Sequence, residues 1–312
     1  MSAKIGIIGA GNMGKGLTLL FAMRGFPVTL YTRDLAKEPA IREAISGNIK
    51  LLSENEVISA ETAEAIPARI SFTDSYEVIA AQADLIIENV VEDLGIKRAL
   101  FAELDRLAKP DVILSSNTSA ISITEIGQDC VNHRERVIGT HFWNPPYLVP
   151  LVEVIETPYS SPDAIARATQ IMEEAKKVPV LCHKDVPGFV ANRLQHALQR
   201  EALNIVARGI ASPEDVDKSI KYGFGMRLGI CPPLEVVDMG GTDLTLSIHE
   251  YLFPDLYNEP EPVPILKEMV ARGDLGFKSG KGVRAWTEDE IRASRENLTK
   301  GLIAVLRALD RL

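Results

Sequence analysis

A glycine-rich loop near the start of the chain constrains the fold more than any other feature. Residues 4–8 are mostly apolar and β-branched, as in a buried parallel strand, and residues 17–23 show the spacing of an apolar helix face. Between them lies a GxGxxG motif made of Gly9, Ala10, Gly11, Asn12, Met13 and Gly14. Between a strand and a helix, such glycines allow a tight turn, let the backbone approach a pyrophosphate and let the helix pack closely. The helix N-terminus adds free N–H groups for the phosphates, so the motif predicts a dinucleotide-binding unit rather than a plain turn.

The rest of the chain shows two successive sequence patterns, one typical of alternating strands and helices and one typical of helices alone. Short apolar runs alternate with helix-like stretches at residues 28–31, 85–87, 112–114, 137–138 and 151–155. This alternation predicts an α/β, Rossmann-type domain with a doubly wound, mostly parallel sheet. Farther along, apolar residues recur about every fourth position and helix-capping patterns begin at Ser212 and Thr287. We therefore expect a dinucleotide-binding domain over residues 1–184 and an all-helical domain over residues 185–312.

Composition excludes several classes of protein. The net charge of −9 leaves no basic surface for nucleic acid. No apolar run approaches the roughly 18 residues that cross a bilayer, and the first residues lead directly into a strand, so we expect no membrane span and no signal peptide. The three cysteines form no CxxC pair, which favours a reducing compartment and argues against zinc. We expect a cytoplasmic protein without a metal.

The end of the second predicted strand indicates which dinucleotide binds. In NAD-binding domains, an acidic residue about 20 residues beyond the glycine motif binds the ribose 2′-hydroxyl. Here Thr32 and Arg33 occupy that place. A hydroxyl donor followed by a guanidinium suits a 2′-phosphate, so we expect NADP to be preferred over NAD. The alternative is that Asp34 serves as the ribose acid and Arg33 remains solvated.

One histidine of the five has a position suited to catalysis. His141 follows a predicted strand over residues 136–140, which places it at the carboxyl edge of the sheet, where ligands of such folds bind. Glu153 lies within the apolar run 151–155, and a carboxylate in a buried strand is unfavourable unless it is paired. A His141–Glu153 pair would fix the imidazole tautomer and make a general base. A neutral structural histidine, with Glu153 at a sheet edge, is the open alternative.

Several motifs occur in the order and spacing of a known family. They are segments 92–97 (Glu-Asp-Leu-Gly-Ile-Lys), 116–119 (Ser-Asn-Thr-Ser), 141–145 (His-Phe-Trp-Asn-Pro), 151–155 (Leu-Val-Glu-Val-Ile) and 185–193 (Asp-Val-Pro-Gly-Phe-Val-Ala-Asn-Arg). Through them the chain resembles the 3-hydroxyacyl-CoA dehydrogenase family, from the glycine loop to about residue 280.

The resemblance implies a role for each matching residue. His141 would take the proton of the substrate's 3-hydroxyl while C3 passes a hydride to the nicotinamide, and Glu153 would orient and charge His141. Ser119 and Asn192 would hold the substrate oxygen. The residues implied at the cofactor are Glu92, Lys97, Asn117, Asn144 and Lys278. The plainer alternatives are that Ser119 caps a helix, that Lys97 is a solvated charge and that Asn192 begins a helix. The helical domain would close the cleft and form a homodimer.

The chain departs from the acyl-CoA enzymes of that family in three places. Thr32 replaces the ribose acid, and the segment before residue 151 lacks the lysine that those enzymes tend to carry. Residues 35–70 should contact CoA, whose polyanionic tail needs several cations. That segment offers only Lys37, Arg42, Lys50 and Arg69.

The Asn-Pro-Pro-Tyr sequence at 144–147 instead resembles the branch of gulonate dehydrogenase (lambda-crystallin), carnitine dehydrogenase and the pyridine-alcohol dehydrogenase of vitamin B6 breakdown. The Gly-Phe-Gly-Met-Arg segment at 223–227 also looks like that branch, and Arg227 is a candidate partner for a free substrate carboxylate. The alternative for Arg227 is an ordinary surface arginine.

Three hypotheses follow from these residues. The leading one is an NAD(P)-dependent dehydrogenase that acts on the hydroxyl of a small, free 3-hydroxy acid. The second is a dehydrogenase of the corresponding CoA thioester, such as 3-hydroxybutyryl-CoA. The third is a non-catalytic, crystallin-like protein that binds NAD(P)H, against which the joint presence of His141, Glu153, Ser119 and Asn192 argues, since a fold alone does not determine function.

Overall fold

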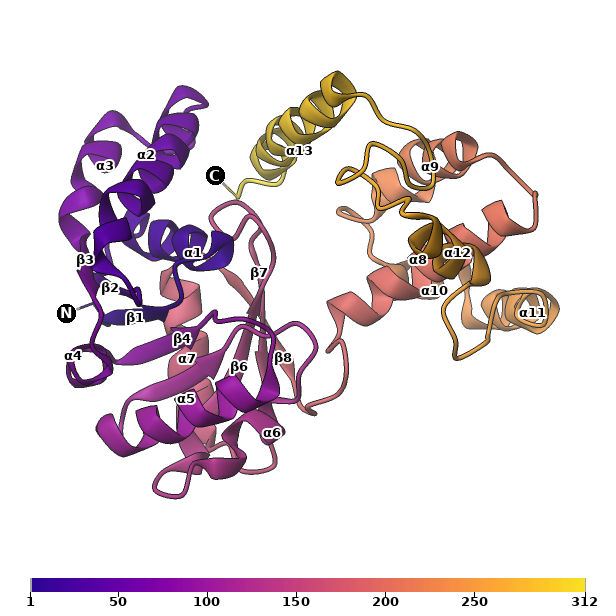
Figure 1. Cartoon of the computed structure of the whole chain (residues 1–312). Helices are drawn as coiled ribbons and strands as arrows, with labels where there is room; N and C mark the ends of the chain where they lie inside the picture. The colour runs from indigo at the N-terminus through magenta and orange to yellow at the C-terminus, as the bar shows by residue number, and fades with distance from the viewer. Residues whose placement is uncertain (1, 312) are drawn as a thin grey trace. The chain divides into compact units, whose positions relative to one another are not determined.

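The computed structural model describes residues 2–311, which form two compact units. The first unit extends to Asn192 and also includes the chain from Thr299 onward, while the second comprises Arg193–Leu298. Figure 1 traces the elements of each unit along the chain. The two units are described separately below.

An eight-stranded sheet forms the centre of the first unit (Figure 1). Its strands are β1 (Ile5–Ile8), β2 (Val28–Tyr31), β3 (Ile70–Thr73), β4 (Leu85–Glu88), β5 (Ile113–Ser116), β6 (Val137–Phe142), β7 (Leu151–Ile155) and β8 (Val178–Cys182). Their order is β3-β2-β1-β4-β5-β6-β7-β8, and only the β6–β7 pair is antiparallel. The prediction of a doubly wound, mostly parallel sheet followed by a helical domain is confirmed.

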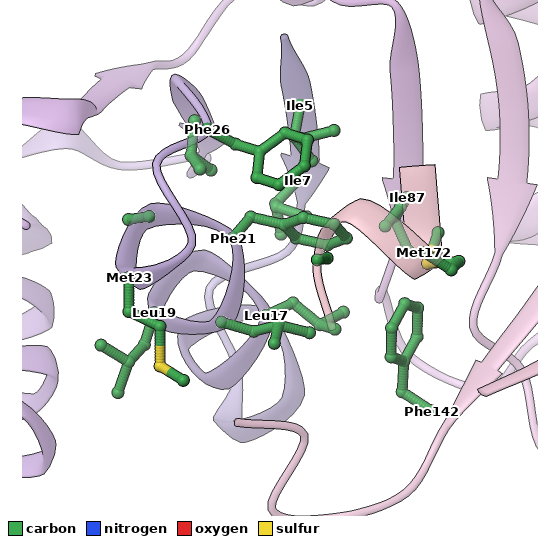
Figure 2. Close-up of a cluster of buried hydrophobic side chains, with 14 of the residues drawn as sticks. Ile5, Ile7, Leu17, Leu19, Phe21, Met23, Phe26, Ile87, Phe142 and Met172 are labelled. Carbon is green, nitrogen blue, oxygen red and sulfur yellow. The ribbon is translucent and has the colours of Figure 1, made fainter. Parts of the chain in front are cut away.

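Helices cover both faces of this sheet because side chains alternate along each strand. The helices are α1 (Asn12–Met23), α2 (Glu38–Glu54), α3 (Ala60–Ala65), α4 (Tyr76–Gln82), α5 (Leu94–Leu107), α6 (Ile123–Ile126) and α7 (Pro162–Glu174). Ile5 and Ile7 of β1 belong to a buried cluster with side chains of α1, α2 and α7, whereas Ile8 belongs to a second cluster with α4, α5 and α6. Figure 2 shows the first cluster, in which Phe21 meets Phe142 edge to face at 6.2 Å.

Strand register brings the polar residues to one edge of the sheet. Ile8, the last residue of β1, pairs with Tyr31 of β2 and Glu88 of β4, and Glu88 pairs with Ser116 of β5. The residues that follow these strands therefore meet at a single edge. The strand order reverses between β1 and β4, which is where such sheets bind ligands.

The second unit is built of helices. They are α8 (Ala191–Ala207, which begins just before the unit), α9 (Pro213–Tyr222), α10 (Pro233–Gly240), α11 (Thr242–Leu252), α12 (Pro264–Arg272) and the first part of α13 (Glu288–Ala308). The predicted caps are present: the Ser212 hydroxyl accepts from the Asp215 amide, and Thr287 and Glu290 cap α13 reciprocally. Between residues 2 and 311, no helix is long and apolar enough to span a membrane.

The end of α13 belongs to the first unit. Ile303 and Leu306 are buried in the same cluster as the apolar face of α2, and the Arg307 guanidinium donates to the Asn55 carbonyl at the end of that helix. The sequence places the domain boundary near residue 184 and assigns the whole terminal helix to the second domain. In the structure the first unit extends to Asn192 and also includes the chain from Thr299 onward. The end of α13 belongs to it because its apolar side chains pack in the same cluster as those of α2.

Replacing Leu306 by alanine should therefore lower the free energy of unfolding by about 2–5 kcal/mol, the usual range for truncating a buried leucine. Leu309→Ala is the matched control, because Leu309 is 41% exposed whereas Leu306 is 5% exposed. Urea denaturation followed by circular dichroism measures both. Equal, small losses in the two variants would show that the end of α13 is not docked on the first unit in solution.

Candidate active site

The glycine loop has the geometry of a phosphate cradle. Gly9 has a φ of 103°, and a Cβ there would lie 2.6 Å from the Asn89 carbonyl oxygen. A Cβ on Gly14 would lie 1.7 Å from the Gly9 carbonyl oxygen, so α1 packs on the loop only with glycine there. At Gly11 a Cβ would meet no atom within 4 Å. The backbone at Gly11 is therefore open to a ligand at the start of α1, and the loop fits a dinucleotide pyrophosphate.

A cavity of about 700 Å³ extends from this loop past the end of β2. Thr32, Arg33 and Lys37 line it, together with Tyr31 and Tyr76, whose rings stack at 4.4 Å. A volume of this size is within the range of cofactor sites. The lining places cationic and hydroxyl groups where the sequence predicts the adenosine ribose.

The side chain of Asp34 already has a hydrogen-bond partner in the protein. Its carboxylate accepts a hydrogen bond from the Ala36 amide at 3.0 Å and caps a short 3₁₀ helix, Leu35–Lys37. The Thr32 hydroxyl donates to the Asp34 carbonyl at 3.3 Å. Arg33 is exposed and makes no hydrogen bond or ion pair with any of residues 2–311.

Glu92 and Lys97 lie in a buried charge network. Lys97 is 1% exposed, and its Nζ lies 2.7 Å from Glu88 Oε1 and 3.1 Å from Glu92 Oε2. Glu92 in turn accepts hydrogen bonds from the Thr118 hydroxyl and from the Ser119 amide. Burial alone would raise the pKa of Glu92, but the bond from Thr118 and the charge of Lys97 outweigh burial and hold that pKa below its usual value. The network thus fixes the turn that carries Ser119.

Asn117 connects the ends of three strands, β4, β5 and β6, at the cofactor-binding edge of the sheet. Its Oδ1 accepts from the Phe142 amide at 2.8 Å, and its Nδ2 donates to Asn89 Oδ1 at 2.7 Å. Its own amide donates to the Glu88 carbonyl at the end of β4. Asn117 therefore links the ends of β4 and β6 through both its side chain and its backbone amide.

His141 and Glu153 face each other across the antiparallel pair β6–β7. His141 Nδ1 lies 2.7 Å from Glu153 Oε2, and the two side chains are almost wholly buried. Glu153 Oε1 accepts from the backbone amides of Val190 and Ala191, each at 2.9 Å. Burial alone would raise the pKa of Glu153, but the hydrogen bonds from His141 and the two amides outweigh burial and keep the pKa below its usual value.

This arrangement leaves the second nitrogen of His141 free for chemistry. Ionised Glu153 can only accept, so Nδ1 carries the proton and Nε2 has the free lone pair. Ser119 Oγ lies 3.0 Å from Nε2, and Asn192 Nδ2 lies 3.5 Å from the Ser119 carbonyl oxygen. The rings of Phe189 and Trp143 lie 5.5 and 6.1 Å from the imidazole. The structure therefore brings the four predicted catalytic residues together: Glu153 binds Nδ1 of His141, Ser119 lies at Nε2, and Asn192 contacts Ser119.

The segment before α8 holds Glu153 through backbone contacts that the sequence did not indicate. Asp185 accepts from the Ser122 hydroxyl at 2.6 Å and from the Thr124 amide at 2.8 Å, which anchors the start of the segment. Phe189 then has a φ of 50° and is buried against His141. The motif at 185–193 marks this segment in the sequence, but the backbone amides that bind Glu153 leave no signal in the side chains.

The remaining predicted residues lie elsewhere. Asn144 is exposed on the loop after β6 and precedes a cis peptide bond to Pro145. Arg227 ends a 3₁₀ helix, Phe224–Arg227, and Lys278 lies in the loop before α13; both are exposed residues of the second unit. Their roles stay predictions. Over residues 2–311, no three His, Cys, Asp or Glu side chains gather as a metal site requires.

Two family models match the chain. The NAD-binding domain of 3-hydroxyacyl-CoA dehydrogenase matches residues 4–186, and the C-terminal domain of the same family matches residues 188–286. A 5-formyl-3-hydroxy-2-methylpyridine 4-carboxylate 5-dehydrogenase from Mesorhizobium japonicum is 35% identical over 99% of both chains. A probable 3-hydroxybutyryl-CoA dehydrogenase from Deinococcus radiodurans is 37% identical over 89% of this chain and 98% of the relative.

Solved structures agree with these matches. A structure of the same type of pyridine-carboxylate dehydrogenase, described as an NAD+ dependent dismutase, has a TM-score of 0.90 at 33% identity and covers 99% of both chains. The (S)-3-hydroxybutyryl-CoA dehydrogenase of Ralstonia eutropha has a TM-score of 0.76 at 30% identity and covers 92% of this chain and 100% of that one. The resemblance predicted from the sequence motifs is confirmed.

Replacing Glu153 by glutamine should lower kcat by roughly 10²–10⁴-fold, the usual contribution of general acid–base catalysis, because an amide cannot stabilise the charged imidazole. Glu156→Gln is the matched control, since Glu156 faces His183 at 3.2 Å on the surface. Steady-state kinetics with cofactor and substrate in excess measure both variants. An unchanged kcat in Glu153→Gln would contradict the role assigned to the pair.

Proposed function

The chain belongs to the 3-hydroxyacyl-CoA dehydrogenase family, and we propose that it transfers a hydride between NADP and the C3 hydroxyl of a small, free 3-hydroxy acid. Membership of the family makes it an NAD-dependent dehydrogenase that acts on a hydroxyl group. The preference for NADP and the free acid are the finer parts of the proposal.

The contact between His141 and Glu153 carries the proposal. In the oxidative direction, His141 Nε2 takes the proton of the substrate hydroxyl while the C3–H bond breaks and a C3=O double bond forms. The bound nicotinamide supplies the hydride acceptor. Glu153 stabilises the imidazolium that results, and Ser119 and Asn192 are positioned to hold the substrate oxygen. In the reverse direction, His141 returns the proton.

The lining of the cofactor cavity supports NADP. Arg33 is free to pair with a phosphate, and Thr32 lines the same cavity. The alternative ribose acid, Asp34, also lines it, but its carboxylate already caps the 3₁₀ helix that follows. Lys37 lies 3.9 Å from that carboxylate at the same cavity.

Two observations favour a free acid over a CoA thioester. Arg42 and Arg69 donate to the carbonyls of Ile70 and Ala22, so neither is free to bind a polyphosphate. In addition, the match to the pyridine-carboxylate dehydrogenase, whose name specifies a carboxylate and no CoA, continues through α13. Arg227 is our candidate for the residue that pairs with the substrate carboxylate. The thioester is the second candidate, because 3-hydroxybutyryl-CoA dehydrogenases are equally similar in sequence.

A homodimer is the expected assembly. Neither α10 nor α11 contains a buried residue, and Leu234, Met239 and Leu246 on these helices are more than half exposed. Apolar surface of this kind is typical of an interface. We propose that a second copy of the chain covers it.

The central test is an assay of the purified protein with NADPH and NADH on short 3-oxo acids and on acetoacetyl-CoA. We expect oxidation of NADPH with a 3-oxo acid and none with the thioester. His141→Ala should lower kcat by about 10²–10⁴-fold, which distinguishes catalysis from a contaminating activity. Rapid reduction of acetoacetyl-CoA would show instead that the substrate is a CoA thioester. Near-full activity of His141→Ala would show that His141 is not the general base.

Replacing Thr32 by aspartate should reverse the cofactor preference, because a carboxylate repels a 2′-phosphate and binds a 2′-hydroxyl. We expect the ratio of the NADPH and NADH dissociation constants to change by at least about tenfold, given roughly 1.5–3 kcal/mol for a hydrogen bond to a charged group. Fluorescence titration with each cofactor measures the ratio. Asp34→Asn should leave the dissociation constant for NADH unchanged. Weaker NADH binding in this variant would show that Asp34, and not residue 32, contacts the ribose.

A further inference from the structure

A buried lysine outside the catalytic group has no acidic partner. Lys177, immediately before β8, is 6% exposed, and none of the carboxylates between residues 2 and 311 forms an ion pair with it. Its Nζ donates instead to the backbone carbonyls of Pro146, at 2.9 Å, and Val149. Lys97, the other fully buried lysine of this unit, is paired with Glu88 in the usual way.

The environment of Lys177 is unfavourable for a charge. Burial, together with the nearby charge of Arg24, lowers the pKa of Lys177 to about 7. Burying a charge beside neutral partners is unfavourable, and this penalty offsets what the two hydrogen bonds contribute to stability. The hydrogen bonds of Lys177 therefore call for an explanation other than stability.

Those bonds hold the loop that links His141 to Glu153. Residues 143–150 connect β6 to β7 and carry Asn144, a predicted cofactor contact. Lys177 binds two carbonyls of this loop, and the amide of the next residue, Val178, donates to the carbonyl of Pro150. The Lys177 ammonium also lies 5.7 Å from the centre of the Phe142 ring, next to His141.

The same loop also packs on the cofactor-binding elements. A Cβ on Gly16 of α1 would lie 2.7 Å from Pro146 Cγ, so the loop and the helix of the glycine motif are in close contact. The Tyr147 hydroxyl donates to Asn48 Oδ1 of α2 at 3.3 Å. The loop is therefore held by contacts with α1 and α2 as well as by Lys177.

We propose that Lys177 is a positioning residue, which fixes residues 143–150 so that Asn144 lies correctly between the catalytic base and the cofactor. The inference rests on the proposed function for its link to catalysis. Lys177 does not act on the substrate itself, because its Nζ is buried and directed at two carbonyl oxygens. Misplacement of such a loop by about 1 Å is sufficient to lower a rate by roughly 10²-fold.

The test compares Lys177→Met with Lys176→Met, which removes the same charge from the adjacent, exposed residue. In Lys177→Met we expect faster hydrogen exchange at the Leu148 and Val149 amides, weaker NADPH binding and a kcat lower by about 10- to 10²-fold. The midpoint of thermal unfolding should change little, because the carbonyls of Pro146 and Val149 lose their donor while a buried charge is removed. Lys176→Met should match the wild type in every measurement.

Tyr147→Phe provides a second variant, since it releases the same loop from Asn48 without touching the buried lysine. We expect smaller changes in the same direction for exchange and NADPH binding. A lower unfolding midpoint in Lys177→Met with unchanged kcat and NADPH binding would overturn the proposal, as would unchanged exchange at residues 148 and 149. Because exchange and binding need no turnover, they test Lys177 even if the assayed 3-oxo acids prove not to be substrates.

Discussion

A carboxylate in the middle of a buried strand is unfavourable by several kcal/mol if it is left unpaired, and Glu153 is fully buried in β7. Its two oxygens are satisfied from different directions, one by the imidazole of His141 and the other by the amides of Val190 and Ala191. The same carboxylate thus sets the tautomer of the base and holds the segment that leads into α8. Catalytic geometry and local stability depend here on one group.

Three buried ionisable side chains around the site have different kinds of partner. Lys97 is paired with Glu88, and Glu153 is surrounded by hydrogen-bond donors, whereas Lys177 meets only carbonyl oxygens. Each arrangement fixes a different part of the site: the turn of Ser119, the base itself and the loop of Asn144. The polar network therefore distributes the positioning of the site over elements that are distant in the sequence.

The elements with strong local signals could be predicted. The glycine loop, six of the eight strands and the caps at Ser212 and Thr287 follow from residues close together in the chain. Strands β3 and β8 could not, because both are edge strands that are only partly buried. Polar Ser71 interrupts the apolar pattern of β3, and β8 contains Pro179. The structure also extends β6 through Phe142, whereas the sequence ends that strand at residue 140.

For the site, side chains could be predicted but not the backbone that supports them. The apolar run around Glu153 implies a partner, and His141 was the natural candidate. The antiparallel register that places the two opposite each other depends on the path of residues 143–150, which their own sequence does not determine. Likewise, the docking of Ile303 and Leu306 depends on a surface of α2 more than two hundred residues away in the chain.

That docking has a consequence for how the protein folds as it is synthesised. Because the first unit resumes at Thr299, the second unit is, in chain order, an insertion within the first. The apolar surface that receives Ile303 and Leu306 stays uncovered until residues 303–306 leave the ribosome, although the rest of the cofactor-binding sheet is made much earlier. A nascent chain stalled or cleaved before that point would therefore expose this surface to aggregation even with the glycine loop and the catalytic pair already translated.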